Sequence, residues 1–248
     1  MTMNKKSLLT LVFALLFAVF FLMLILFRIP FHPYPLINYQ DVFDLLTPLV
    51  LIPLYWIMFK YTNREGSHLA EEIIFMVLAS LWMLGHGMHL AANAIDNLAE
   101  GLAKKQVLDI LNTDIYTLTY FLDEHLSHYL WHFGIAGLAA LLVYREWRYP
   151  AKEEITWWVT ILAGLISGIT YFCVFDEGQT VPLGLPFTFI ITSFTLIWGR
   201  KKMVQQPIYA FFFIACLIAF ILFVGWGLYW CGYPEILDVF SGSVQRCM

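Results

Sequence analysis

Charged residues are scarce in this chain. Asp, Glu, Lys and Arg make up 13% of its 248 residues, whereas 60% are hydrophobic and 18% are aromatic. Soluble globular domains carry about 25% charged residues, because their surfaces face water. The small share of charge and the mean hydropathy of +0.73 exclude an ordinary soluble domain. They indicate an integral membrane protein whose side chains meet lipids.

Basic clusters and cysteine motifs are also lacking. The formal net charge is -4, and the most basic run is the short segment Arg200-Lys201-Lys202, so no nucleic-acid partner is expected. The four cysteines show no C-x-x-C spacing, which argues against a thioredoxin-like motif and a cysteine-based zinc module. Cys231 and Cys247 both fall at the C-terminal end, and an oxidising compartment would allow them to form a disulfide.

The chain has no internal repeat, low-complexity tract or linker, so we expect residues 1–248 to form a single polytopic membrane domain. The inverted repeats that are typical of many secondary transporters are missing as well. The apolar run at the N-terminus is too long for the core of a signal peptide, which spans roughly 7–15 residues. We predict that this run is retained as the first membrane helix.

Seven apolar runs approach the roughly 20 residues that a membrane-spanning helix needs. They predict an all-α integral membrane protein with about seven transmembrane helices in a single bundle. Between the third and fourth runs, residues 97–111 mix apolar and charged side chains in a way that favours a short interfacial helix. The seven runs cover residues 7–27, 43–61, 69–95, 115–144, 156–176, 183–199 and 207–231.

Lys and Arg are distributed unevenly between the two sides of the predicted bundle. Ten lie on the side of the N-terminus and four on the other side. The positive-inside rule then predicts a cytoplasmic N-terminus and an outer or lumenal C-terminus. The first set is Lys5, Lys6, Lys60, Arg64, Arg145, Arg148, Lys152, Arg200, Lys201 and Lys202, and the second is Arg28, Lys104, Lys105 and Arg246.

Ionisable residues inside apolar spans are candidates for function, because each costs about 2.5–3.5 kcal/mol at the bilayer centre. In the third span, one helix face carries four polar residues within an arc of about 80°. They are His86, His89, Asn93 and Asp96. We expect this face to point into the bundle.

The fourth span carries a second polar stripe. At about 100° per residue, His125, His128 and His132 lie within an arc of about 60°, and Glu124 lies about 40° beyond His128. Asp123 is predicted on the opposite side of this helix. The third and fourth spans are antiparallel and their polar residues have similar depths, so we expect the two stripes to face each other in the outer half of the bilayer.

Imidazole and carboxylate groups together suit a divalent transition metal, with zinc or iron as the first candidates. Glu124 is expected to act as a ligand or general base, and Asn93 and Asp96 to orient the substrate. Asp176 and Glu177, at the end of the fifth span, fit solvated loop charges better than a site, but they would be near its mouth. The predicted metal ligands are His86, His89, His125, His128, His132 and Glu124.

These features favour a membrane-embedded, metal-dependent enzyme that acts on a lipid or another apolar substrate, with hydrolysis as the first reaction class and oxidation as the second. One alternative is electron transfer through a haem held by one histidine from each stripe. Another is a proton- or metal-ion-coupled transporter that uses the histidines and carboxylates as a relay. A further alternative is that these histidines and carboxylates form a hydrogen-bond network with a purely structural role.

Two enzyme families share part of this pattern. The alkaline ceramidase and progestin-receptor-like superfamily combines seven helices with an intramembrane zinc site, but its last helix carries a histidine pair, and this chain has no histidine after His132. Residues 85–89 and 123–131 resemble stretches of the emopamil-binding sterol isomerase family, whose enzymes use no metal. The resemblance is confined to these stretches, and Asn93 stands at the second acidic position, so we assign the chain to neither family.

Overall fold

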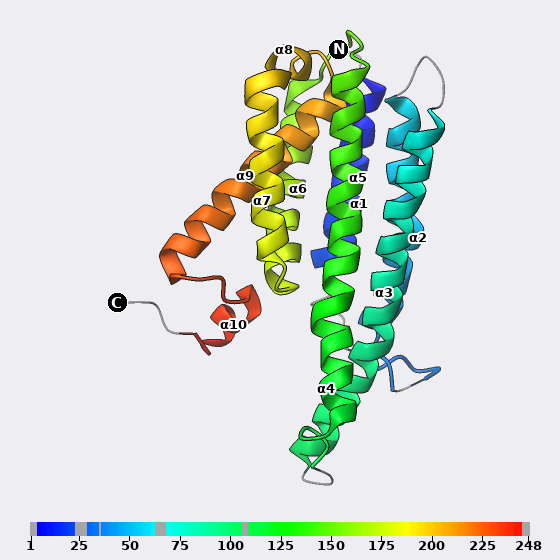
Figure 1. Ribbon diagram of the computed structural model, residues 1–248, viewed down its shortest axis with the longest axis vertical. Coiled ribbons are helices and arrows are strands. Elements are labelled where there is room, and N and C mark those ends of the chain that lie inside the picture. Colours follow the sequence, from blue (N-terminus) through cyan, green and yellow to red (C-terminus); the bar gives the residue numbers. More distant parts are fainter. Residues whose placement is uncertain (1–3, 23–28, 35, 63–67, 106–108, 245–248) are drawn as a thin grey trace.

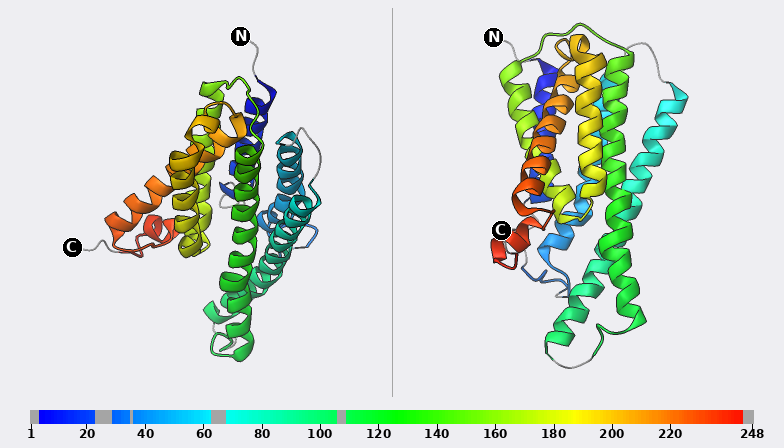
Figure 2. Two further views of the ribbon diagram at one scale, coloured as in Figure 1. Left: turned by 45° about the horizontal axis from the view of Figure 1, so that its top comes forward. Right: turned by 60° about the vertical axis from the view of Figure 1, so that its left-hand side comes forward.

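The computed structural model of the protein is a helical bundle (Figures 1 and 2). It describes residues 4–22, 29–34, 36–62, 68–105 and 109–244. Within these residues there is no strand, and seven helices are long and apolar enough to cross a membrane. The protein is therefore an integral, multi-pass membrane protein.

The seven candidate spans comprise both single helices and helices that run on through a π-helical turn. The single helices are α1 (Lys5–Leu22), α2 (Tyr39–Tyr61), α3 (Leu69–Lys104), α6 (Trp157–Glu177) and α9 (Pro207–Trp230). The composite ones are α4 (Asp114–Tyr120), η2 (Phe121–Ser127) and α5 (His128–Arg148), then α7 (Val181–Phe194), η3 (Thr195–Gly199) and α8 (Arg200–Met203). A short helix, α10 (Ile236–Ser241), follows the last span.

Each predicted span corresponds to one of these seven helices, so the predicted count is confirmed. The sixth span forms despite its prolines. Pro182 lies in the first turn of α7, where a backbone N–H has no partner within the helix anyway. The sequence leaves open whether Cys231 pairs with Cys247, and Cys247 lies outside the described part of the chain.

The short helix predicted at 97–111 is not a separate element in its first part, and residues 106–108 of this range lie outside the described part of the chain. Residues up to Lys104 belong to α3, which continues for 36 residues without a break. At about 1.5 Å per residue this helix is roughly 54 Å long, well beyond the roughly 30 Å of the hydrocarbon core. The partner helix formed by α4, η2 and α5 is nearly as long. Together they extend past the ends of the other helices (Figure 1).

Glycines allow α3 and α5 to pack closely. A Cβ atom at Gly85 would lie 2.6 Å from the backbone oxygen of Ser127 and from the backbone nitrogen of Trp131. Gly134 on α5 approaches the backbone of α3 in the same way. Such close contact between small residues is a common basis for helix packing in membranes. It fixes the polar faces of the two helices relative to each other.

Aromatic side chains fill the middle of the bundle. Phe13, Phe17, Tyr55 and Tyr171 are fully buried. The rings of Phe13 and Tyr55 have centroids 4.8 Å apart, and the hydroxyl groups of Tyr55 and Tyr171 lie 3.0 Å apart within a hydrogen bond. These contacts join α1, α2 and α6 in the middle of the bundle.

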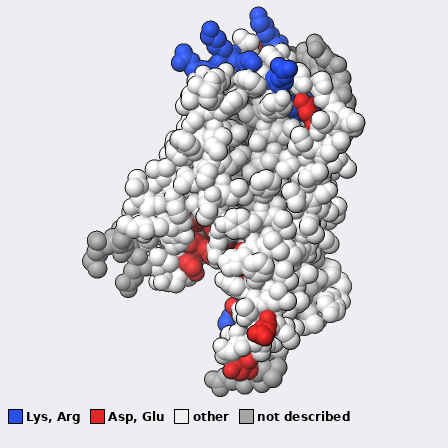
Figure 3. All heavy atoms as spheres, in the orientation of Figure 1, with Lys and Arg blue, Asp and Glu red and all other residues white. Residues whose placement is uncertain are grey.

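The two ends of the bundle differ in charge. On the face shown in Figure 3, most Lys and Arg lie at the end where the N-terminus is, whereas Asp and Glu gather in and below a hollow at the other end. At the basic end, Arg145 of α5 is buried, forms an ion pair with Glu71 of α3 and donates a hydrogen bond to Thr62. Which end faces the cytoplasm stays a prediction.

Candidate functional site

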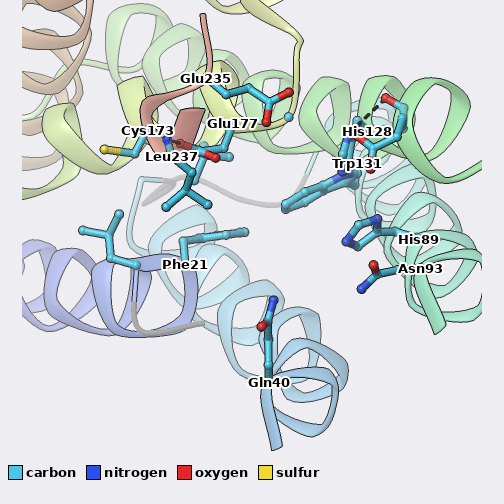
Figure 4. A pocket seen from close by; sticks show the side chains of 14 residues that line it. Phe21, Gln40, His89, Asn93, His128, Trp131, Cys173, Glu177, Glu235 and Leu237 are labelled. Carbon is cyan, nitrogen blue, oxygen red and sulfur yellow. Dashed lines mark hydrogen bonds and ion pairs between the residues drawn. The ribbon is translucent and has the colours of Figure 1, made fainter. Parts of the chain in front are cut away.

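A cavity of about 250 Å³ opens at the end of the bundle opposite to the N-terminus. It lies where α1 ends, α2 begins and α6 ends, between polar side chains of α2, α3 and α5 and apolar side chains of α1 and α6 (Figure 4). It is lined by Phe21, Leu22, Gln40, His89, Asn93, Glu124, His128, Trp131, Cys173, Val174, Glu177, Gly178, Glu235 and Leu237.

The π-helical turn η2 determines which residues of the fourth span face inward. In an α-helix, Asp123 and His128 would lie about 140° apart around the axis. A π turn holds roughly one more residue, so each residue advances by about 80° and residues five apart come within about 40°. Asp123 is accordingly buried, and His125 is exposed beside Tyr120 and Phe121. Both the outward position predicted for Asp123 and the inward position predicted for His125 are therefore wrong.

Two histidines of α3 are paired with buried carboxylates. Nδ1 of His89 lies 2.7 Å from Oδ1 of Asp123, and Nε2 of His86 lies 2.9 Å from Oδ1 of Asp44 on α2. Asp123 is fully buried and Asp44 is 6% exposed. A carboxylate against an imidazole restricts the orientation of the ring. His89 lines the cavity and can use its second ring nitrogen there, whereas His86 is buried and does not line it.

His128 adds a third imidazole at the cavity wall. Its ring centroid is 4.7 Å from that of His89. Nδ1 of His128 lies 3.1 Å from the backbone oxygen of Glu124 and 3.8 Å from its Oε2. His89, His128 and Glu124 all line the cavity. Three ionisable groups from two helices therefore meet on one wall.

His132 lies deeper and has a different partner. Its ring is fully buried, and Nδ1 forms a hydrogen bond with the hydroxyl of Thr180, just before α7. A Cβ atom at Gly178, where α6 ends, would collide with Cε1 of His132. The end of α6 and the start of α7 therefore hold this ring in place.

Trp131 is the common aromatic neighbour of the buried histidines. Its ring centroid is 4.1 Å from that of His132 and 4.8 Å from that of His86. The rings of His128 and His89 follow at 5.9 Å and 6.3 Å. The indole itself lines the cavity, so the side chain that positions the histidines is also available to a bound molecule.

Half of the predicted site residues reach the cavity. His89, Asn93, Glu124 and His128 line it, although they come from two helices whose depths were only estimated from the sequence. Glu177, an open candidate in the sequence, lines it as well. The predicted meeting of the two polar stripes is thus found for these residues, while their role as metal ligands stays a prediction.

The remaining predicted residues lie elsewhere. His86 and His132 are buried among other side chains and do not line the cavity. Asp96 and the exposed His125 are not among the lining residues, and neither is the buried Asp176. His86 and His132 therefore contact the cavity-lining Trp131 without lining the cavity themselves, and His125 does not reach the cavity.

Sequence reasoning missed Asp44, Gln40 and Glu235. Asp44 lies just inside the predicted second span and was easily counted as an end charge, whereas Gln40 and Glu235 lie outside the predicted spans. One feature of the sequence could have singled out Asp44. Asp41 caps the start of α2 by accepting a hydrogen bond from the backbone N–H of Asn38. Asp44, three residues later, is therefore not needed as a helix cap and is a candidate for another role.

The C-terminal segment covers part of the cavity mouth. The backbone N–H of Leu237 donates to Oε1 of Glu177 over 2.9 Å, and Nε2 of Gln179 donates to Oε1 of Glu235 over 2.6 Å. Burial raises the pKa of the Glu235 carboxyl. Glu235 and Leu237 thereby bring a carboxylate and an apolar side chain to the cavity from beyond the last span.

Among the described residues, no group of three or more His, Cys, Asp or Glu side chains is placed to hold a metal ion. In the observed arrangement, Nδ1 of His89 lies against Asp123, and Nε2 of His86 lies against Asp44. The predicted transition metal, and the haem of the alternative hypothesis, stay untested by this geometry.

Comparison with known proteins gives one distant similarity. The chain is 20% identical over 216 residues to the ceroid-lipofuscinosis neuronal protein 6 homolog of the dog, Canis lupus familiaris. The alignment covers 82% of this chain but 66% of the relative, so the chain spans just under two thirds of that protein's length. No family model matches the chain, and no solved structure matches it. The function must therefore be argued from the site.

Proposed function

We propose that the protein is a membrane-embedded enzyme that carries out acid–base chemistry on a lipid or another apolar molecule bound in the cavity. The observation that carries this proposal is the pair formed by His89 and the fully buried Asp123 at the cavity wall, with Glu124 and His128 beside it. Ionisable groups at membrane depth are costly, and such groups are typically retained for function.

His89 has a carboxylate close to one ring nitrogen, and the carboxylate near the other ring nitrogen lies farther away. Nδ1 lies against Asp123, while Nε2 is 4.0 Å from Oδ2 of Asp44, which is beyond hydrogen-bond length. The ring can therefore exchange a proton with a bound molecule while Asp123 stabilises the imidazolium. The carboxyl group of Glu124 on the same wall serves as the second acid or base, so that one group takes a proton and the other supplies one.

The apolar nature of the substrate follows from the apolar part of the lining. Phe21 and Leu22 of α1, Val174 of α6 and Leu237 of the C-terminal segment bring apolar side chains to the cavity. A cavity with both apolar and polar lining, at the end of membrane helices, suits an amphiphile that enters from the lipid.

The test is conversion of lipids by the purified protein in vesicles made from total membrane lipids, followed by mass spectrometry. The wild type is expected to change the abundance of a lipid species, and the variants H89A and D123N to do so at least about 100-fold more slowly. H125A, which replaces an exposed histidine one helical turn from His128, is the matched control and should convert lipids like the wild type. Unchanged lipids with the wild type, or full conversion by H89A, would overturn the proposal.

A metal-assisted version of the same enzyme is the second candidate. It is supported by the 4.7 Å separation of the His89 and His128 rings and by the nearby Glu124, which together supply nitrogen and oxygen ligands at the cavity wall. Elemental analysis of the detergent-purified protein should then find zinc or iron near one per chain in the wild type and much less in H128A. A protein that converts lipid without stoichiometric metal would rule this version out.

A further inference from the structure

Of the Asp, Glu, Lys and Arg residues, only acidic ones are among the residues that line the cavity. Glu124 of η2, Glu177 of α6 and Glu235 of the C-terminal segment line it, and no Lys or Arg is among the lining residues. Within the described residues, Glu177 and Glu235 accept hydrogen bonds from the neutral groups of Leu237 and Gln179, and neither forms an ion pair with Lys or Arg. Among the described residues, three carboxyl groups from three separate elements therefore face one space without a Lys or Arg partner, beside the imidazoles of His89 and His128.

Trp131 provides an independent sign of a ligand. Its side chain is 6% exposed, and Nε1 has no hydrogen-bond partner among the residues that the structure describes. The indole reaches into the cavity beside His89 (Figure 4). A buried indole N–H normally finds an acceptor, and the face of an indole attracts cations. An oxygen-bearing, positively charged molecule would satisfy both properties.

A small polar hollow of about 90 Å³ adjoins the cavity and shares Gln40 and Asn93 with it. It is lined by amide side chains and one carboxylate, from Asn38, Gln40, Asp41, Asn93 and Asn97. Amides bind hydroxyl and amino groups without needing an opposite charge, and they give no compensation for a phosphate. The lining of this hollow is thus acidic or neutral throughout.

We propose that the cavity selects an amphiphile with a positively charged amino head group and discriminates against anionic lipids. This inference rests on the proposed function, because it names the class of substrate for the same site. The amino group lies among Glu124, Glu177 and Glu235 and over the face of Trp131, and the apolar chain lies along Phe21. An anionic head group is repelled by the same carboxylates.

The experiment compares dodecylamine, dodecanol and dodecyl phosphate, which share one apolar chain and differ in head-group charge. Each is titrated against the full-length protein in maltoside micelles, and binding is followed by tryptophan fluorescence. The amine should bind about tenfold more tightly than the alcohol, and the phosphate more weakly than either. E124Q and E235Q, which lie on different elements, should each weaken amine binding roughly fivefold and reduce the preference for the amine over the alcohol. E154Q, at an exposed site in the loop before α6, is the matched control and should bind like the wild type.

The outcomes separate this inference from the proposed function. Equal binding of amine and alcohol, tighter binding of the phosphate, or an amine preference that persists in both Gln variants would overturn the inference and leave an enzyme for neutral or anionic lipids. If none of the three amphiphiles binds, the inference also fails, and lipid conversion in vesicles then decides on its own whether the enzyme proposal survives.

Discussion

Replacing Gly85 by alanine should separate α3 from α5 and disturb the site, because the added methyl group meets backbone atoms. Its Cβ would lie 2.6 Å from the backbone oxygen of Ser127 and the backbone nitrogen of Trp131, so relief requires a shift of whole helices. Overpacking of this kind costs roughly 1–3 kcal/mol. Gly87, one residue on from His86, has no atom within 4 Å of the position of its Cβ.

The pair of variants removes the effect of helix propensity. Alanine is favoured over glycine inside a helix by up to about 1 kcal/mol, and this gain applies to G85A and G87A alike. The difference between the two variants is therefore the overpacking cost alone. At roughly 2–4 °C per kcal/mol for a chain of this size, G85A should unfold some 2–12 °C below G87A.

The assay is thermal unfolding of both variants in the same detergent, followed by tryptophan fluorescence, with lipid conversion measured in parallel. We expect G87A to be as stable as the wild type or slightly more stable, and to keep its activity. G85A should lose stability and activity together, since Trp131 and the histidines around it depend on this contact. Equal unfolding temperatures for the two variants would refute the packing argument.

Two further predictions concern buried partners. E71A leaves the buried Arg145 without its carboxylate and should cost about 3–5 kcal/mol of stability. E72A affects a surface pair with Lys60 and should cost less than about 1 kcal/mol. Similar losses of stability for the two variants in chemical unfolding experiments would contradict the burial of the pair between Glu71 and Arg145. G178A should push the ring of His132 away from Thr180 and lower lipid conversion more than stability; unchanged kinetics in this variant would show that His132 has no influence on the site.

The fold was predictable because the signal is mainly one of length and composition. Seven apolar runs give seven helices, and even the sixth run forms one, with Pro182 in its first turn and Pro186 inside the helix. The end of α3 was not predictable in the same way. Asn97 to Lys104 are polar enough to leave the membrane, but polarity alone does not end a helix, and α3 continues through Gly101 to Lys104.

The site was predictable in part. His89 and His128 meet because their depths on antiparallel helices follow from residue counts, which hold for any α-helix. The positions of Asp123 and His125 came out reversed, because a π turn changes the angle per residue and has no clear signature in a single sequence. Asp44 was missed because its partner, His86, lies on a different helix, and such pairs are determined by packing.

The most direct test of the account is to map where a membrane-dissolved amphiphile binds. A long-chain alcohol with a photoactivatable group at the end of its chain is irradiated with the protein in vesicles, and the labelled peptides are identified by mass spectrometry. If the amphiphile binds in the cavity, we expect labelling around Trp131, Val174 and Leu237 that excess unlabelled amphiphile removes. Labelling only at lipid-facing positions such as Ile197 and Leu228, without competition, would contradict it.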